Sequence, residues 1–198
     1  MDKNEISALF LGDSLAKRDQ WFELFKDKIF VPKYTMDWDE TRDLPFKRLT
    51  KVRESGLFKI RDWYTNPKNI FLAHEMLAQV DGSTAIKFTV NYNLFGGTLV
   101  SLSSQRHEKY FDLIDSGDIV GCFCLTELGF GNNAVKMETT VEYDDKTKEF
   151  IINTPTVLSQ KYWITNGFKH SNYAMLFGKT IVKGKDEGVA AFLVRTRD

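Results

Sequence analysis

Two short segments of the chain combine residue types that can hold a flat, polar molecule. The first, Thr126–Asn133, has glycines at positions 129 and 131 between a threonine and two asparagines. Glycines let backbone N–H groups approach an anion or a flat ring closely, and the hydroxyl and amide groups add hydrogen-bond partners. The residues that follow read as a strand and not as a helix, which excludes a dinucleotide-binding fingerprint. An ordinary turn that uses glycine and asparagine for positive φ angles is the alternative.

The second segment is Gln160–Gly167, which contains Trp163 and Thr165. We predict a strand here, and in a strand these two side chains project to the same face. A broad aromatic plane beside a hydroxyl group suits a planar cofactor that forms hydrogen bonds. The alternative is a tryptophan buried in the core of a sheet.

The elements that position these segments change character near residue 118. Before it, apolar residues recur at helical spacing, as at Trp21, Phe22 and Phe25. After Val120 the pattern alternates, which is typical of strands. The residues on the alternating face are Met137, Thr139, Val141 and Tyr143. Helices followed by strands predict an α+β fold, with a helical domain over residues 1–118 and a β domain over residues 119–198.

Glycine and cap residues predict where the helices begin and end. Gly56 is expected to end one helix, and Ser83 to cap the start of another. That second helix is expected to run towards Leu94 and to break at Gly96 and Gly97. A further short helix is then expected before the first strand.

Composition excludes several classes of function. The 198 residues include 27 Lys and Arg against 27 Asp and Glu, so the chain has no excess of positive charge that would bind nucleic acid. No run of eighteen apolar residues exists, so no membrane span is expected.

Cys122 and Cys124 share one face of a strand and lie too close for a regular disulfide. Because the histidines are also scattered, we expect no metal site. The N-terminus lacks a signal or transit pattern, which argues against secretion, and the C-terminus is not the Ser-Lys-Leu peroxisomal signal.

In this order and spacing, the two segments resemble those of the acyl-CoA oxidase and acyl-CoA dehydrogenase superfamily, and the resemblance covers most of the chain. Cys122–Gly131 matches the family's glycine loop, while Glu138–Thr140 and Lys161–Trp163 resemble the oxidase branch. Ile164–Gly167 is more similar to the dehydrogenases, so the electron acceptor stays open between oxygen and an electron carrier. The resemblance implies an N-terminal helical domain, an incomplete antiparallel β-barrel-like middle domain, and an absent C-terminal helical bundle.

The resemblance also implies FAD as the cofactor and a fatty acyl-CoA as the substrate. The positions that match flavin-lining residues are Leu125, Thr126, Gly131 and Asn132. Trp163 matches the indole that packs on the isoalloxazine, and Thr165 matches the hydroxyl near its reactive edge. The implied reaction is α,β-desaturation in fatty-acid β-oxidation, in which a base removes the α-proton while the flavin accepts the β-hydride.

The base of that reaction is a glutamate of the family's C-terminal domain, and no glutamate here matches it, since Glu127 belongs to the flavin loop. We therefore expect no catalytic residue in this chain and interpret it first as an inactive fragment of a flavin-dependent acyl-CoA oxidase. The alternatives are one chain of a split enzyme and a non-catalytic structural or assembly subunit of a larger complex. The expected partners are further copies of the chain, or a second chain that completes the β domain and the C-terminal bundle. By family, the expected location is the peroxisome or the mitochondrial matrix.

Overall fold

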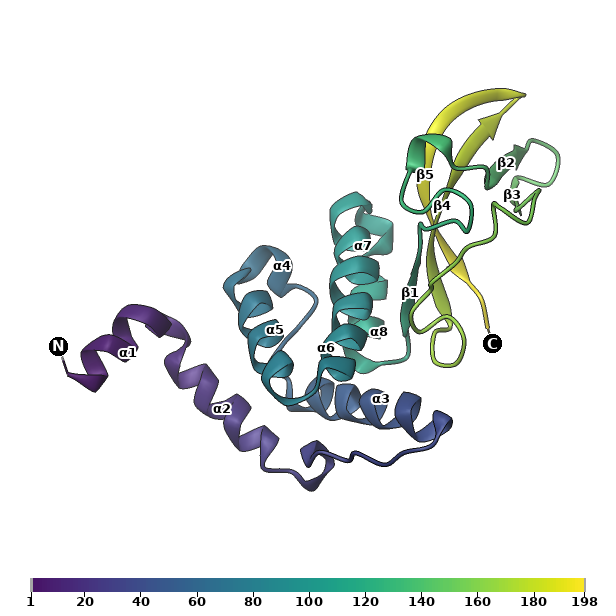
Figure 1. The fold of residues 1–198 in the computed structure, drawn as a ribbon. Coiled ribbons are helices and arrows are strands. Elements are labelled where there is room, and N and C mark those ends of the chain that lie inside the picture. Colours follow the sequence, from purple (N-terminus) through teal and green to yellow (C-terminus); the bar gives the residue numbers. More distant parts are fainter. Residues whose placement is uncertain (1, 198) are drawn as a thin grey trace.

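Helices form the N-terminal part of the chain and strands the C-terminal part in the computed structural model, which describes residues 2–197 (Figure 1). The helices are α1 (Lys3–Leu11), α2 (Leu15–Phe25), α3 (Trp38–Ser55), α4 (Asp62–Thr65), α5 (Lys68–Val80), α6 (Gly82–Phe88), α7 (Gly97–Leu102) and α8 (Lys109–Ser116). A π-helical segment, Thr89–Gly96, joins α6 to α7. The strands are β1 (Gly121–Cys124), β2 (Thr140–Asp144), β3 (Glu149–Asn153), β4 (Tyr173–Val182) and β5 (Lys185–Arg195). The predicted α+β class is confirmed.

β4 is the central strand of one curled sheet (Figure 1). β1 and β2 pair end to end along β4, with Gly121 opposite Tyr173 and Thr140 opposite Lys179, and both run parallel to it. β5 pairs with β4 and β3 pairs with β2, and both of these pairs are antiparallel. The antiparallel pairing expected from the sequence thus applies to these two pairs only. β1 and β2 run in the same direction, because the chain leaves the sheet as a loop between them and re-enters it without reversing.

Two helix ends test the predictions made from local signals. Gly56 ends α3 with a φ of 67°, as predicted. α6 is capped by the carboxylate of Asp81, which accepts hydrogen bonds from the N–H groups of Ser83 and Thr84, so the prediction of Ser83 as the cap is wrong. Asp81 is the cap because it is the extended residue directly before the first helical turn, and from there a side-chain oxygen reaches the first free N–H groups.

Gly96 and Gly97 do not break the helix, contrary to the prediction. The helix continues through the π-helical segment into α7 and ends at Leu102. A Cβ atom on Gly96 would collide with Ile60, and one on Gly97 with Trp63. The two glycines therefore allow close packing between elements and do not form a turn.

One hydrophobic core joins the helices to the sheet. The largest fully buried side chains of its helical part include Trp21, Phe88, Tyr92 and Phe95. Met175 of β4 extends the core to the sheet. A smaller cluster contains Cys122 and Cys124, whose free thiols have Sγ atoms 3.7 Å apart, so the two cysteines are small core residues as predicted.

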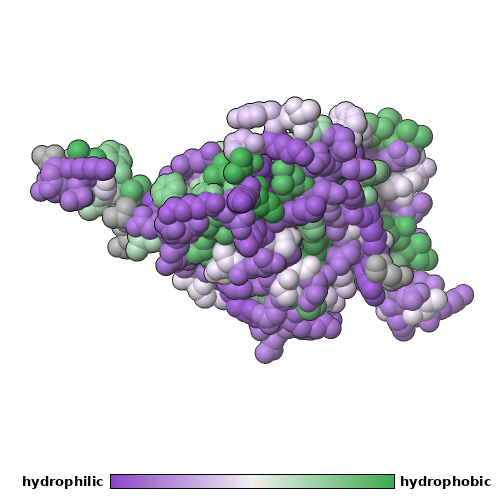
Figure 2. Space-filling view, turned by 90° about the horizontal axis from the view of Figure 1, so that it is seen from below, coloured by the Kyte–Doolittle hydropathy of each residue, from purple (hydrophilic) through white to green (hydrophobic). Residues whose placement is uncertain are grey.

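α1 projects from one end of the molecule (Figures 1 and 2). Its side chains Leu9 and Phe10 are 70% and 78% exposed. Among the helices of residues 2–197, none is both long and apolar enough to cross a membrane.

Candidate functional site

The loop that follows β1, residues 125–133, closes on itself as a tight turn. The N–H of Gly131 donates to the carbonyl oxygen of Glu127 over 2.8 Å, and the N–H of Glu127 donates back to Gly131 over 3.1 Å. Gly131 has a φ of 58°, in the left-handed region that side chains disfavour. The segment is therefore a turn, and Gly131 is required by its backbone angle.

The structure places the two segments singled out from the sequence side by side. The N–H of Leu128 donates to Gln160 over 2.9 Å, and the N–H of Tyr162 donates to Thr126 over 3.1 Å. The N–H of Gly129 adds a third bond, to the carbonyl oxygen of Leu158, two residues before the second segment. Segments that are about thirty residues apart in the sequence thus form one continuous surface.

The second segment is not a strand, so that prediction is wrong. Only Lys161 forms an isolated bridge, with Glu127, and the chain then coils into turns over residues 165–170. Trp163 and Asn166 have φ angles of 60° and 69°, which end any extended run. The indole of Trp163 is 85% exposed, which excludes the alternative of a tryptophan in the sheet core. Because the strand is absent, the argument that Trp163 and Thr165 share a face no longer applies.

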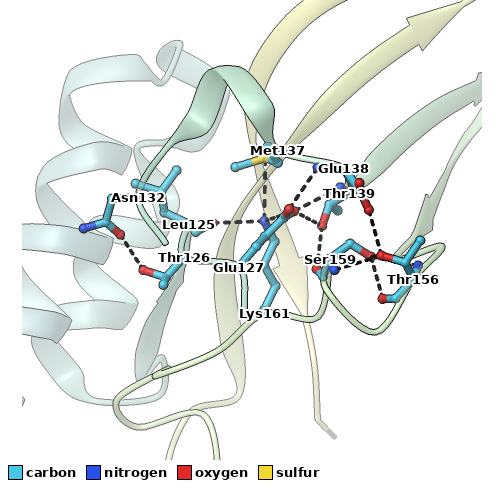
Figure 3. A network of polar contacts seen from close by, with 10 residues as sticks. All are labelled: Leu125, Thr126, Glu127, Asn132, Met137, Glu138, Thr139, Thr156, Ser159 and Lys161. Atoms are coloured by element: carbon cyan, nitrogen blue, oxygen red, sulfur yellow. Dashed lines mark hydrogen bonds and ion pairs between the residues drawn. The ribbon is translucent and has the colours of Figure 1, made fainter. Parts of the chain in front are cut away.

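A buried ion pair, which we call the loop anchor, holds the loop in place (Figure 3). The carboxylate of Glu127 is 1% exposed and lies 3.1 Å from Nζ of Lys161. It also accepts hydrogen bonds from the N–H of Glu138 over 2.9 Å and from the N–H and hydroxyl of Thr139. Lys161 donates in addition to the carbonyl oxygen of Leu125 over 3.1 Å. The loop anchor therefore connects both segments to the start of β2.

The charge state of the loop anchor follows from these bonds. Burial raises the pKa of Glu127, but the hydrogen bonds from Thr139, the Glu138 N–H and Lys161 together hold it below its ordinary value. Burial lowers the pKa of Lys161, and its pairing with Glu127 opposes that effect. Glu127 is thus an ionised acceptor with its partners in place, which is a structural role and not that of a free base.

Sequence reasoning missed the pairing of Glu127 with Lys161 and Thr139, although one signal was present. Met137, Thr139 and Val141 lie on the buried face of the alternating pattern, as predicted. A polar side chain at an inward position needs a hydrogen-bond partner, so Thr139 pointed to a buried acceptor.

The groups at the surface of the loop fit a flat molecule that accepts hydrogen bonds. The hydroxyl of Thr126 donates to Oδ1 of Asn132 over 2.6 Å, and Asn132 is exposed. The backbone N–H groups of Thr126 and Asn132 have no acceptor among the described residues, so both are free to donate to a bound molecule. Trp163 directly follows Tyr162, whose N–H bonds to Thr126, and its exposed ring adds an apolar plane in the adjoining segment.

The remaining predicted site residues lie close by. Leu125 is half-buried and contributes its carbonyl oxygen to Lys161, while Thr165 is half-buried in the turn that follows Trp163. Within residues 2–197, no group of three or more His, Cys, Asp or Glu side chains is placed to hold a metal ion.

Comparisons with known proteins agree with one another. The chain is similar to the peroxisomal acyl-coenzyme A oxidase 3 of Arabidopsis thaliana, with 32% identity over 100% of this chain and 32% of that protein. Human peroxisomal acyl-coenzyme A oxidase 3 is 32% identical over 92% of this chain and 26% of its own length. Acyl-CoA oxidase 1 of Yarrowia lipolytica, a solved structure, matches 94% of this chain and 27% of that chain with a TM-score of 0.80 and 27% identity. The chain belongs to the acyl-CoA oxidase and acyl-CoA dehydrogenase superfamily.

This superfamily member spans about a quarter to a third of the length of the curated relatives it matches. Another similar structure is that of Caenorhabditis elegans acyl-CoA oxidase-1 complexed with FAD and ATP, with 25% identity and a TM-score of 0.73 over 92% of this chain and 28% of that chain. No protein-family model matches the chain.

Proposed function

We propose that this chain supplies the FAD-facing part of a peroxisomal acyl-CoA oxidase, which desaturates a fatty acyl-CoA between its α and β carbons. The relatives described above are named acyl-CoA oxidases, and the plant and human ones are named peroxisomal. They favour the oxidase over the dehydrogenase and give no support to the mitochondrial matrix, which was the alternative location.

The observation that carries this proposal is that the loop is hydrogen-bonded to the segment that carries the exposed indole of Trp163. Free N–H groups of Thr126 and Asn132 would meet acceptor atoms of the flavin ring, and Trp163 would cover a face of that ring. Bound there, FAD would accept the hydride from the β carbon. The chain's own contribution is to bind and orient the flavin and to exclude water from the face that Trp163 covers.

Glu127 does not supply the base that removes the α-proton. Its oxygens already accept from Lys161, Thr139 and the Glu138 N–H, and its pKa is held low. A general base must reach the proton it removes and be free to accept it. We therefore propose that the base comes from outside this chain, either from the rest of a longer enzyme or from a second chain.

Titration of the purified chain with FAD tests the proposal. We expect quenching of flavin fluorescence at one FAD per chain, and a loss of affinity of about tenfold in Trp163→Ala, since one aromatic stacking contact is worth roughly 1 kcal/mol or more. The matched control is Trp38→Ala, which removes an indole that is 80% exposed at the start of α3. Trp38→Ala is expected to leave the affinity unchanged.

The outcomes separate the interpretations. Equal FAD affinity in Trp163→Ala and Trp38→Ala would contradict the placement of the flavin, and absence of FAD binding would favour a non-catalytic structural subunit. Addition of a fatty acyl-CoA to the FAD-loaded chain then addresses the reaction. Hydrogen peroxide formed under air only when a second chain is supplied supports a split oxidase, whereas reduction of an artificial electron carrier without peroxide indicates a dehydrogenase.

A further inference from the structure

A small polar cluster, which we call the polar joint, connects the helices to the first residue of β1. The N–H of Gly121 donates to Oδ1 of Asn91 over 2.8 Å, and its carbonyl oxygen accepts from Nδ2 of Asn166 over 3.3 Å. Asn91 belongs to the π-helical segment and is fully buried, and Asn166, in the turn after Trp163, is 7% exposed. Both backbone groups of one glycine are therefore held by side chains from two other parts of the fold.

Lys87 completes the polar joint from α6. Its Nζ lies 3.1 Å from Oδ1 of Asn166 and 3.3 Å from Nδ1 of His170. Lys87 precedes Asn91 by four residues, which places both on the same face of the helix. Because an ammonium group only donates, Nδ1 of His170 is the acceptor, and its Nε2–H donates to Asp43 of α3 over 3.1 Å.

Two sets of contacts hold the turn that follows Trp163: those of the polar joint, and hydrogen bonds from Arg197, after β5, to the carbonyl oxygens of residues 167–169. His170 stacks on Phe46 of α3, with ring centroids 4.2 Å apart, so the far end of the turn is fixed to the helices as well. Trp163 and Asn166 both have left-handed φ angles. Asparagine tolerates this region, but a tryptophan keeps such an angle only where the surroundings enforce it. The indole of Trp163 is exposed and has little packing of its own, so the backbone of the turn decides where it lies.

We propose that Asn166 and Lys87 are positioning residues, which set the indole of Trp163 at the distance from the loop that a flat cofactor needs. This inference rests on the proposed function, because it assigns the indole to the flavin. Asn166 fixes the turn to β1 through Gly121, and Lys87 fixes Asn166 to α6. The helical part of the chain thereby sets the geometry of a site whose surface belongs to the sheet part.

A double-mutant cycle distinguishes positioning from general support of the fold. We expect Lys87→Met to weaken FAD binding by about fivefold in the natural chain and to have little further effect in Trp163→Ala, because residues in one network are not additive. Equal losses in both backgrounds would show that Lys87 supports the fold only and would overturn the inference. Lys68→Met, an exposed lysine on α5, is the matched control and is expected to change nothing.

Hydrogen exchange gives a second readout that needs no flavin. The N–H groups of His170 and Ser171 donate to the carbonyl oxygen of Asn166 over 3.2 and 3.0 Å, and they report on the turn. Asn166→Gly keeps the left-handed angle accessible but removes both side-chain contacts, so we expect faster exchange at these two positions. Lys87→Met should accelerate the same two positions, which provides a test if Asn166→Gly fails to fold.

The two readouts separate failure of the inference from failure of the proposed function. A natural chain that does not bind FAD contradicts the proposed function, and exchange then decides whether the joint holds the turn. FAD affinity and exchange rates that stay unchanged in Lys87→Met and Asn166→Gly would overturn the inference and leave the proposed function standing.

Discussion

The loop anchor and the polar joint hold neighbouring halves of the same surface, but they are built differently. The loop anchor pairs Glu127, 1% exposed, with Lys161, whose side chain is 10% exposed, and all of its members follow β1 in the chain. The polar joint centres on the neutral amides of Asn91 and Asn166 and connects helices to β1. The loop is therefore fixed within the sheet part, whereas the turn with Trp163 is held from the helices as well as by hydrogen bonds from Arg197, after β5, to the carbonyl oxygens of residues 167–169.

The difference has an energetic consequence. Removal of one partner of a buried ion pair leaves an uncompensated charge and typically costs about 3–5 kcal/mol. Removal of a neutral hydrogen bond that leaves one buried group without a partner costs about 1–3 kcal/mol. We therefore expect the loop anchor to dominate stability and the polar joint to dominate the geometry of the site.

Glu127→Gln is the strongest test of this comparison. The free energy of unfolding should fall by about 3 kcal/mol, because Lys161 then has no carboxylate beside it. Urea unfolding monitored by circular dichroism measures the change. Glu142→Gln, an exposed glutamate on β2, is the matched control. A stability for Glu127→Gln that equals that of the control would show that the charge of Glu127 is not required.

Gly121→Ala is expected to have the next largest effect, at the polar joint. A Cβ on Gly121 would lie 2.0 Å from the ring of Phe95, so β1 or the π-helical segment must shift. Overpacking of this kind costs about 1–3 kcal/mol, again measured by urea unfolding. Gly82→Ala is the control, because a Cβ there meets nothing within 4 Å. Equal stability of the two variants would contradict the close contact of β1 with the helices.

Gly131→Ala tests the loop without touching either cluster. A Cβ on Gly131 meets nothing within 4 Å, so the expected loss arises from its φ of 58° alone. The left-handed conformation costs an alanine about 1–2 kcal/mol. Gly131→Asn should cost less, because asparagine tolerates this region, and a larger loss for Gly131→Asn than for Gly131→Ala would contradict the backbone explanation.

Features that depend on periodic burial were predictable from the sequence. Val141 faces inward because alternation in a strand follows directly from its geometry, and the same spacing extends to Met137 and Thr139, which are buried just before β2. The end of α3 at Gly56 was predictable because its left-handed cap is a local requirement. The glycine loop and the segment Gln160–Gly167 were also identifiable from the sequence, because the residue types that mark them lie within a few consecutive positions.

Features that depend on distant contacts were not predictable. A strand over Gln160–Gly167 fits the local pattern, but Asn166 is bound by Lys87, which lies 79 residues away in the sequence. Gly96 and Gly97 read as a break because only the folded protein shows the side chains that pack on them. Tertiary contacts overrode local signals at the polar joint in particular, which is where two parts of the fold meet.

The two clusters should also respond to acid at different pH values. Burial, and then the charge of Lys87, lower the pKa of His170, while its hydrogen bond to Asp43 opposes this. The folded chain thus favours neutral His170 more than the unfolded chain does, so stability is lost as pH falls through the ordinary histidine pKa of about 6.5. The charged groups around His170 are Asp39, Arg42 and Asp43 on α3, Lys87 on α6 and Lys169 on its own turn.

Protonated His170 would turn an N–H towards the ammonium group of Lys87, so the polar joint should weaken first on acidification. The expected loss of stability is smaller than for any of the three substitutions above. Glu127 stabilises the folded chain in its charged form, because its carboxyl pKa is lowered on folding. This contribution to stability is lost only as pH falls below the ordinary glutamate value of about 4.5. Urea midpoints measured from neutral pH downwards should therefore fall in two steps. His170→Gln should remove the upper step and keep the lower one, and an upper step that persists in this variant would assign it to another group.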